Sequence, residues 1–239
     1  MNLPDSLVLS TDAYVTSICY IGSKSLSHVL SSIERCKERL LAIGATSPSS
    51  RKQIIESVME YWKDQPGIGV NIVDKLLNYT ILSPTSVVDW ALAREGARLS
   101  DAHVFEMIGA TVGKVTGRVR QVVQAKNARG LLEEQKKILI ETVERERTGM
   151  KGLFQVMEDS LVGWATGSKD QAQESGDMGP EDAMIRQWGQ RWLRVFRRKF
   201  AVEEAWYIET ELEAQKPPVE AANGSLPEVV MRDEGDGIE

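Results

Sequence analysis

The chain has 239 residues, and its 42% hydrophobic and 27% charged content is typical of a folded globular protein. A formal net charge of −6 disfavours a free-standing nucleic-acid-binding protein, because contacts with phosphates need a basic surface. Two cysteines, Cys19 and Cys36, are too few for a disulfide framework, and no apolar run approaches the ~18 residues of a membrane span. Residues 1–10 lack the features of a signal peptide. We therefore expect an intracellular protein.

The N-terminal part of the chain predicts a helical hairpin around Gly22. Apolar residues recur at helical spacing on both sides of it: Tyr14, Val15, Ile18 and Ile21 before, and Leu26, Val29, Leu30, Ile33, Leu40 and Leu41 after. Gly22 can adopt the left-handed conformation that ends a helix, and Ser23 or Ser25 can cap the next one. We expect one helix over residues 11–21 and a second over 25–43.

Glycine, serine and proline then divide the chain into further helices. Gly44 ends the second helix, Ser47-Pro48 opens a third and Pro66-Gly67 ends it, Ser83-Pro84 separates a fourth from a fifth, and Ser100-Asp101 caps a sixth. Each of these segments is apolar on one face only, and the connections are short. Such helices are stable only when they dock on antiparallel neighbours.

After a break at residues 127–130 the pattern changes. Apolar residues from Leu132 to Trp164 lie three, four or seven apart, sparse and embedded in charged residues at first, and dense later. We interpret this stretch as one long helix that projects from the body and returns to it, with a bend permitted at Gly149 and Gly152. The projection is expected over residues 118–148.

The end of the chain predicts a loop, a last helix and a tail. Residues 166–179 are rich in Ser, Gly, Gln and Asp, Pro180 opens the last helix, and the acidic segment after it has few aromatics and is expected to be disordered. The predicted fold is therefore all-α, with stacked antiparallel helical hairpins of the HEAT/armadillo kind and a projecting coiled-coil-like helix pair. Its expected divisions are an N-terminal extension (1–10), a helical-repeat domain (11–212) and an acidic tail (213–239).

The sequence offers little that could carry catalysis. The two histidines, His28 and His103, have no Cys, Asp or Glu partners at a spacing that would hold a catalytic metal. There is neither a phosphate-binding loop nor a Gly-x-Ser-x-Gly motif. We expect no enzymatic activity, no cofactor and no metal.

Two features of the last helix could serve recognition. Trp188 and Trp192 are four residues apart and share a helix face, where they either pack in the core or stack on bases. Beside them runs a basic ridge, which is either a solvated face or a contact for an acidic partner or an RNA backbone. The residues of this ridge are Arg191, Arg194, Arg197, Arg198 and Lys199.

Several segments, in the same order along the chain, resemble the last helical-repeat domain of the large subunit of the nuclear cap-binding complex, of the fungal type. They are Gly22 to Ile33, Val73 to Leu77, Val88 to Leu92, Leu131 to Gln135, and Leu153-Phe154. The resemblance extends over roughly residues 11–209, and its specificity comes from the shared order of the segments.

The resemblance implies a stacked helical scaffold, similar to the middle domain of the translation-initiation scaffold, with no catalytic activity. In that family the large subunit grips a small subunit whose RNA-recognition motif stacks the methylated guanine cap, so capped RNA is bound indirectly. The implied roles are pre-mRNA processing and splicing, mRNA export and mRNA surveillance including nonsense-mediated decay. The implied partners include other RNA-processing factors. The implied location is the nucleus, with shuttling to the cytoplasm. The chain corresponds to only the last of the family's three domains.

We predict two partner-binding surfaces. Lys24, Ser25 and His28 cluster at a hairpin tip next to a strong core and are expected to face the small subunit. Arg194, Arg197 and Arg198 of the basic ridge form the second. Two alternatives keep the fold and change the role: an adaptor that docks a helicase or a peptide, or direct RNA binding through residues 191–199, which predicts a steep dependence on salt.

Overall fold

The computed structural model describes residues 5–93, 98–167 and 180–215, and these residues form helices and connections without a β-strand. The predicted all-α fold is confirmed. The elements are α1 (Asp5–Ile21), α2 (Leu26–Arg35), α3 (Lys37–Thr46), α4 (Pro48–Tyr61), α5 (Pro66–Asn78), α6 (Pro84–Ala91), the 3-10 helix η1 (Arg98–Ser100), α7 (Ala102–Lys126), α8 (Glu133–Thr166) and α9 (Pro180–Ala214).

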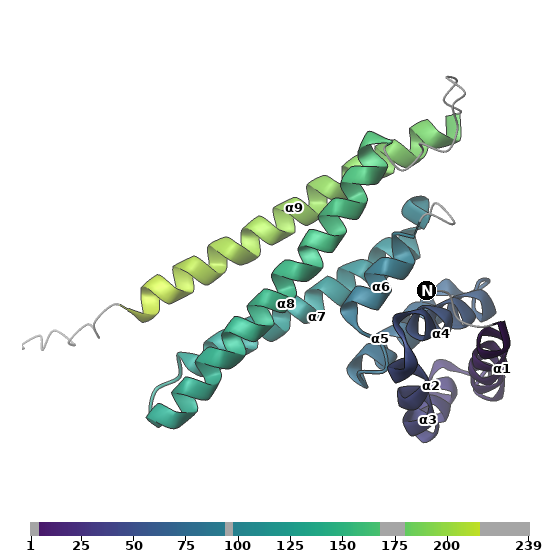
Figure 1. Cartoon of the computed structure of the whole chain (residues 1–239), viewed down its shortest axis with the longest axis horizontal. Coiled ribbons are helices and arrows are strands. Elements are labelled where there is room, and N and C mark those ends of the chain that lie inside the picture. The colour runs from purple at the N-terminus through teal and green to yellow at the C-terminus, as the bar shows by residue number, and fades with distance from the viewer. Residues whose placement is uncertain (1–4, 94–97, 168–179, 216–239) are drawn as a thin grey trace, which may run out of the picture.

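The short helices α1–α6 stack on one another at one side of the molecule (Figure 1). Helix α4 lies at their centre and contacts α1, α3, α5 and α6. Local chemistry explains where they begin: Ser47 accepts a hydrogen bond from the Ser50 N–H with Pro48 in the first turn of α4, and Ser83 and Ser86 form a reciprocal capping box at the start of α6. The predicted Ser-Pro helix starts are confirmed.

Four boundaries differ from the prediction. Helix α1 begins at Asp5, not near residue 11, and Pro66 opens α5 rather than ending α4. The helix expected over 25–43 is two helices separated at Cys36, and Gly44 lies inside α3 instead of ending a helix. The break lets α2 pack on α1 and α5 while α3 packs on α4, which a straight helix could not do.

Gly22 has a different role from the expected one. Its backbone is not left-handed; among the described glycines only Gly130 and Gly167 have positive φ. Instead α1 and α2 approach so closely that a Cβ at Gly22 would lie 2.3 Å from the Cα of Val29. The glycine is therefore required for space at the hairpin, and Ser25, not Ser23, caps α2.

The apolar stripes of all the helices merge into one core. Its largest fully buried side chains come from both the short and the long helices: Trp90, Trp192, Leu40, Ile54, Ile55, Ile72, Leu76, Ile81, Met107, Ile108, Met150 and Met157. Each helix is thus stabilised by its neighbours rather than alone.

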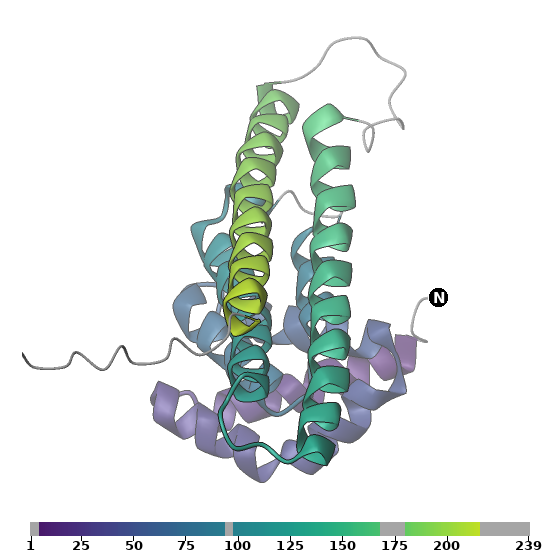
Figure 2. The same ribbon diagram turned by 90° about the vertical axis from the view of Figure 1, so that its left-hand side faces the viewer.

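The three long helices run side by side, with α8 antiparallel to α7 and α9 (Figures 1 and 2). The end of α7 and the start of α8 extend beyond the short helices, as the predicted projecting pair (Figure 1). Helix α8 is continuous through Gly149 and Gly152, and Gly167 closes it with a left-handed φ of 72°. Most of the predicted loop, residues 168–179, and the tail from 216 onward lie outside the described residues.

Candidate functional site

The structure brings Lys24, Ser25 and His28 together as exposed residues at the α1–α2 hairpin. The Ser25 hydroxyl accepts a hydrogen bond from the His28 backbone N–H at 3.3 Å and lies 2.7 Å from the ring nitrogen Nδ1 of the same histidine. Ser25 and His28 therefore have a structural role as the N-terminal cap of α2. Lys24 has no partner among the described residues, so its charge is available for recognition.

Two large side chains beside this cluster are also exposed. Tyr20 and Ile21, in the last turn of α1, are 71% and 68% accessible. The apolar spacing predicted Ile21 as part of the buried stripe, and this is wrong because α1 reaches its end before that position meets a neighbour. Exposed aromatic and aliphatic groups next to a free cation are typical of protein-binding surfaces. We call Tyr20, Ile21, Lys24, Ser25 and His28 the hairpin-tip surface.

The basic ridge on α9 divides into paired and unpaired residues. The Arg197 guanidinium lies 2.7 Å from a Glu158 oxygen, Lys199 lies 2.7 Å from Glu203, and Arg191 stacks over the Trp188 ring at 5.1 Å. Within residues 5–93, 98–167 and 180–215, Arg194 and Arg198 have no carboxylate partner, and both are exposed. The charge available for a ligand is therefore concentrated on these two arginines.

The tryptophan pair belongs to the core rather than to a base-stacking platform. Trp192 is 2% exposed, and its ring packs against Phe105 and Phe196 with centroid distances of 5.1 and 6.2 Å. Trp188 is half-buried and packs against the same core. The interpretation of these residues as core is confirmed.

Sequence reasoning missed the ion pairs that join α9 to its neighbours. Arg120 of α7 lies 2.8 Å from Glu203, and Arg147 of α8 lies 3.0 Å from Glu204. Burial raises the pKa of Glu203, but the hydrogen bond from Arg120 and the contact with Lys199 outweigh it, so the net pKa is lowered. These partners are 57 to 83 residues apart in sequence, so no local pattern could reveal them.

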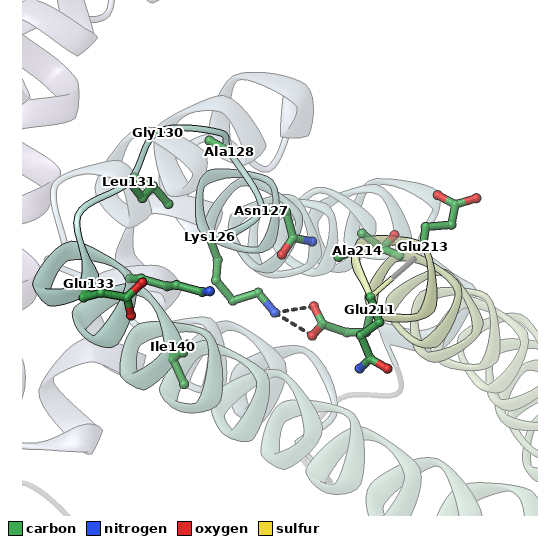
Figure 3. A pocket seen from close by; sticks show the side chains of 13 residues that line it. Lys126, Asn127, Ala128, Gly130, Leu131, Glu133, Ile140, Glu211, Glu213 and Ala214 are labelled. Atoms are coloured by element: carbon green, nitrogen blue, oxygen red, sulfur yellow. Dashed lines mark hydrogen bonds and ion pairs between the residues drawn. The ribbon is translucent and has the colours of Figure 1, made fainter. Parts of the chain in front are cut away.

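A cavity of about 600 Å³ lies where the end of α7, the start of α8 and the end of α9 meet (Figure 3). Lys126 points toward Glu211 across it, with an ion-pair distance of 2.5 Å. These opposite charges satisfy each other, and the part of the chain that the structure describes holds no group of three or more His, Cys, Asp or Glu side chains placed to bind a metal. None of its helices is both long and apolar enough to span a bilayer.

The two predicted surfaces do not form one site. The hairpin-tip surface belongs to the short helices, whereas Arg194, Arg197 and Arg198 lie on α9, on the other side of α7 and α8 (Figures 1 and 2). A single small partner would therefore meet one surface or the other.

Comparison with known proteins shows which proteins this chain resembles in sequence. Residues 1–205 match the sequence model of the family described as MIF4G like. The nuclear cap-binding protein subunit 1 of Schizosaccharomyces pombe is 31% identical over 121 residues, which is 50% of this chain and 16% of that protein. The human protein of that name is 24% identical over 178 residues (64% and 22%), and the Xenopus tropicalis protein is 22% identical over 228 residues (85% and 29%).

The resemblance carried by the colinear sequence segments is thus confirmed. The chain spans less than a third of the length of these curated relatives. Since the family match covers 205 of the 239 residues and the described helices stack as the fold requires, the chain belongs to the MIF4G-like family.

Proposed function

We propose that this chain is a helical scaffold domain of a nuclear cap-binding complex large subunit and that it holds the small subunit with an RNA-recognition motif. The observation that carries the proposal is the similarity to proteins named nuclear cap-binding protein subunit 1 in yeast and vertebrates. Their name also supports a nuclear location. Membership in the MIF4G-like family agrees with the prediction that the chain is not an enzyme.

The hairpin-tip surface is the best-supported contact for the small subunit. Tyr20 and Ile21 offer exposed apolar area, and beside them Lys24 offers a charge with no partner in the described part of the chain. Directly behind them, Gly22 packs against Val29 and Ser25 caps α2, so the surface is held on a rigid hairpin. A preordered contact of this kind lowers the ordering cost of binding.

The scaffold acts on the cap indirectly. A partner that is ordered by docking binds its own ligand more tightly, because the ordering cost is no longer subtracted from the affinity for the cap. The roles in pre-mRNA processing, splicing, export and surveillance, and the shuttling, would follow from the complex that the chain helps to assemble.

The proposal is tested by titrating the full chain with the small subunit of the same organism. We expect Tyr20→Ala and Lys24→Glu each to weaken the Kd by about tenfold or more, as truncation of a central interface residue does. Lys137→Glu, an exposed charge reversal on α8, is the matched control and leaves the Kd unchanged. His28→Ala is measured beside them, whereas Ser25→Ala is avoided because it removes the α2 cap.

Two results would contradict the proposal. If the full chain fails to bind the small subunit at micromolar concentrations, the adaptor alternative, which docks a helicase or a peptide, gains support. If Tyr20→Ala and Lys24→Glu bind as well as the parent chain, the interface lies elsewhere on the scaffold.

Direct RNA binding is the second candidate, favoured by Arg194 and Arg198, which meet no carboxylate within the described ranges. It predicts that the isolated chain binds RNA with an affinity that falls steeply with salt and is lost in Arg194→Glu/Arg198→Glu. The scaffold proposal predicts no such binding in the absence of the small subunit.

A further inference from the structure

No described residue covers the outward side of α9, and the side chains on this side change from basic to apolar along the helix. At 100° per residue, the six side chains named below lie within an arc of about 120°, on the side opposite the buried Trp192 and Phe196, and the exposed Glu209 lies in the same arc. Toward the end of the helix they are apolar and about half exposed: Val202, Ile208 and Leu212. Toward its start they are basic: Arg191, Arg194 and Arg198. In Figure 1, α9 lies at the edge of the molecule.

Two arginines on this surface have no ion-pair partner among the described residues. Arg194 and Arg198 meet no carboxylate anywhere in the described ranges, in contrast to Arg197, which lies one residue away from Arg198 and pairs with Glu158. Val195, which follows Arg194 in the sequence, is 47% exposed. A surface that combines free guanidinium groups with exposed aliphatic groups suits a segment that is both apolar and acidic.

The sequence that follows α9 has this character in matching order. Residues 216–239 contain six carboxylate and two cationic side chains. Apolar residues come first, at Leu226, Val229, Val230 and Met231, and a run of carboxylates follows, at Asp233, Glu234, Asp236 and Glu239. From the C-terminal end of α9 toward its N-terminal end, the outward side of the helix likewise presents apolar residues and then basic residues. If the chain ran back antiparallel to α9, its apolar residues would therefore lie beside the apolar residues of the helix and its carboxylates beside the arginines.

The chain is long enough for this return. Along the helix, Arg198 lies about 26 Å from Gln215, at 1.5 Å per residue. The eighteen residues from Gln215 to Asp233 span up to about 60 Å when extended. The excess allows the chain to reverse direction at Pro217-Pro218 and still place its carboxylates over the arginines.

We propose that residues 226–239 dock antiparallel on the outward side of α9, with Leu226–Met231 over Val202, Ile208 and Leu212, and the acidic run over Arg194 and Arg198. The docked segment covers the exposed apolar side chains and neutralises the unpaired arginines. It also occupies the charges that direct RNA binding would use, so an acidic partner or an RNA would have to displace it.

The test is carbodiimide cross-linking of the full chain, with mass spectrometry on the monomeric fraction. Lys199, next to Arg198 and 43% exposed in its side chain, reports a tail carboxylate at the arginines, and Lys24 and Lys63, exposed on the side of the short helices, are the distant lysines. We expect links from Lys199 to residues 233–239 that fall by about fivefold in Arg194→Glu/Arg198→Glu. They should fall similarly at about 0.5 M NaCl, where the Debye length is about 4 Å.

An exchange of charges between the two segments distinguishes specific pairing of the tail with the arginines from links that form only because the tail is nearby. Combining Arg194→Glu/Arg198→Glu with Asp233→Lys/Glu234→Lys should create new links between the reversed positions, while either half alone gives none. Tail links spread evenly over the distant lysines, or unaffected by the arginine variants, would overturn the proposal. So would links concentrated on Lys136, which would put the tail in the cavity at the helix ends, or links found only in dimers, which would make the occupant a second copy.

Discussion

The short helices α1–α6 and the C-terminal half of α9 are held in place by different interactions. Around α4, fully buried aliphatic side chains such as Ile54, Ile55 and Ile72 fill the contacts. Along α9 from Glu203 onward, by contrast, the contacts with α7 and α8 include the ion pairs Arg120–Glu203 and Arg147–Glu204. Apolar packing depends little on pH and on the screening of charges by salt, whereas these ion pairs depend on both. The two regions should therefore lose their structure under different conditions of pH and salt.

The difference also explains where each region could bind a partner. A hairpin fixed by apolar packing, such as α1–α2, presents a rigid surface without cost to its own stability. The outward side of α9 is instead graded in charge, so ligands there would be selected by electrostatics.

The largest effect is expected in the apolar region. Trp90 is 2% exposed, its indole N–H donates to Glu56 at 2.5 Å, and Arg98 stacks on its ring at 4.1 Å. Trp90→Ala should lower the free energy of unfolding by about 3–5 kcal/mol, measured by urea denaturation. Ile208→Ala, at an exposed position, should change it by less than about 0.5 kcal/mol. Equal effects of the two variants would contradict the assigned core.

The next effect concerns the charged contacts of α9. Glu203→Gln should cost about 1.5–3 kcal/mol at neutral pH, because it removes a charged hydrogen-bond acceptor from Arg120 at a position only 3% exposed. Glu209→Gln, on the exposed side of the same helix, is the control and should be neutral. An equal loss in both variants would show that the effect is not due to the buried pair.

The contribution of Glu203 to the stability of the fold should depend on pH in a predictable direction. The folded-state pKa of Glu203 is lowered from its usual 4.5, so its ionised form stabilises the fold at pH values above the unfolded-state pKa. That stabilisation is lost as the pH falls through the folded-state value. Denaturation curves of Glu203→Gln and the parent should therefore converge in acid, and a gap that persists there would contradict the account.

A smaller effect is expected at the start of α6. Ser83→Ala removes the capping hydrogen bond to the Ser86 N–H and should cost about 1 kcal/mol, whereas Ser83→Gly should cost only a few tenths. Thermal unfolding of the two variants measures the difference. Indistinguishable melting temperatures would mean that the cap contributes nothing beyond the backbone conformation.

The smallest effect sharpens the distinction between buried and exposed ion pairs. The Arg197–Glu158 pair is about half exposed on both sides, so Arg197→Gln should cost at most about 1 kcal/mol. A loss as large as that of Glu203→Gln would mean that burial does not govern the strength of these contacts.

Local patterns predicted most of the fold because residues at the start of several helices mark where those helices begin. Ser47-Pro48 and Ser83-Pro84 begin helices through chemistry within four residues. The break at Cys36 could not be predicted, because neither glycine nor proline marks it and its cause is the different packing partners of α2 and α3. Pairs such as Arg120–Glu203 also escape prediction, since only the fold brings them together.

The candidate surfaces were predicted less well than the fold. The polar residues at the hairpin tip are visible in the sequence, but the exposure of Ile21 is not, because it continues the apolar spacing of Tyr14, Val15 and Ile18. The basic ridge could be read as five charges. Only the structure shows that Glu158 of α8 pairs with Arg197 and that Glu203, further along α9, pairs with Lys199. These pairs leave Arg194 and Arg198 as the charges available to a ligand.

The most direct test of the central proposal is the affinity of the small subunit for a methylguanosine cap analogue, measured by fluorescence quenching with and without saturating full chain. We predict at least a tenfold tighter Kd in the presence of the chain, about 1.4 kcal/mol, and a smaller gain with the Lys24→Glu variant at the same concentration. An unchanged Kd, with binding of the two proteins verified in the same sample, would contradict a scaffold that orders its partner.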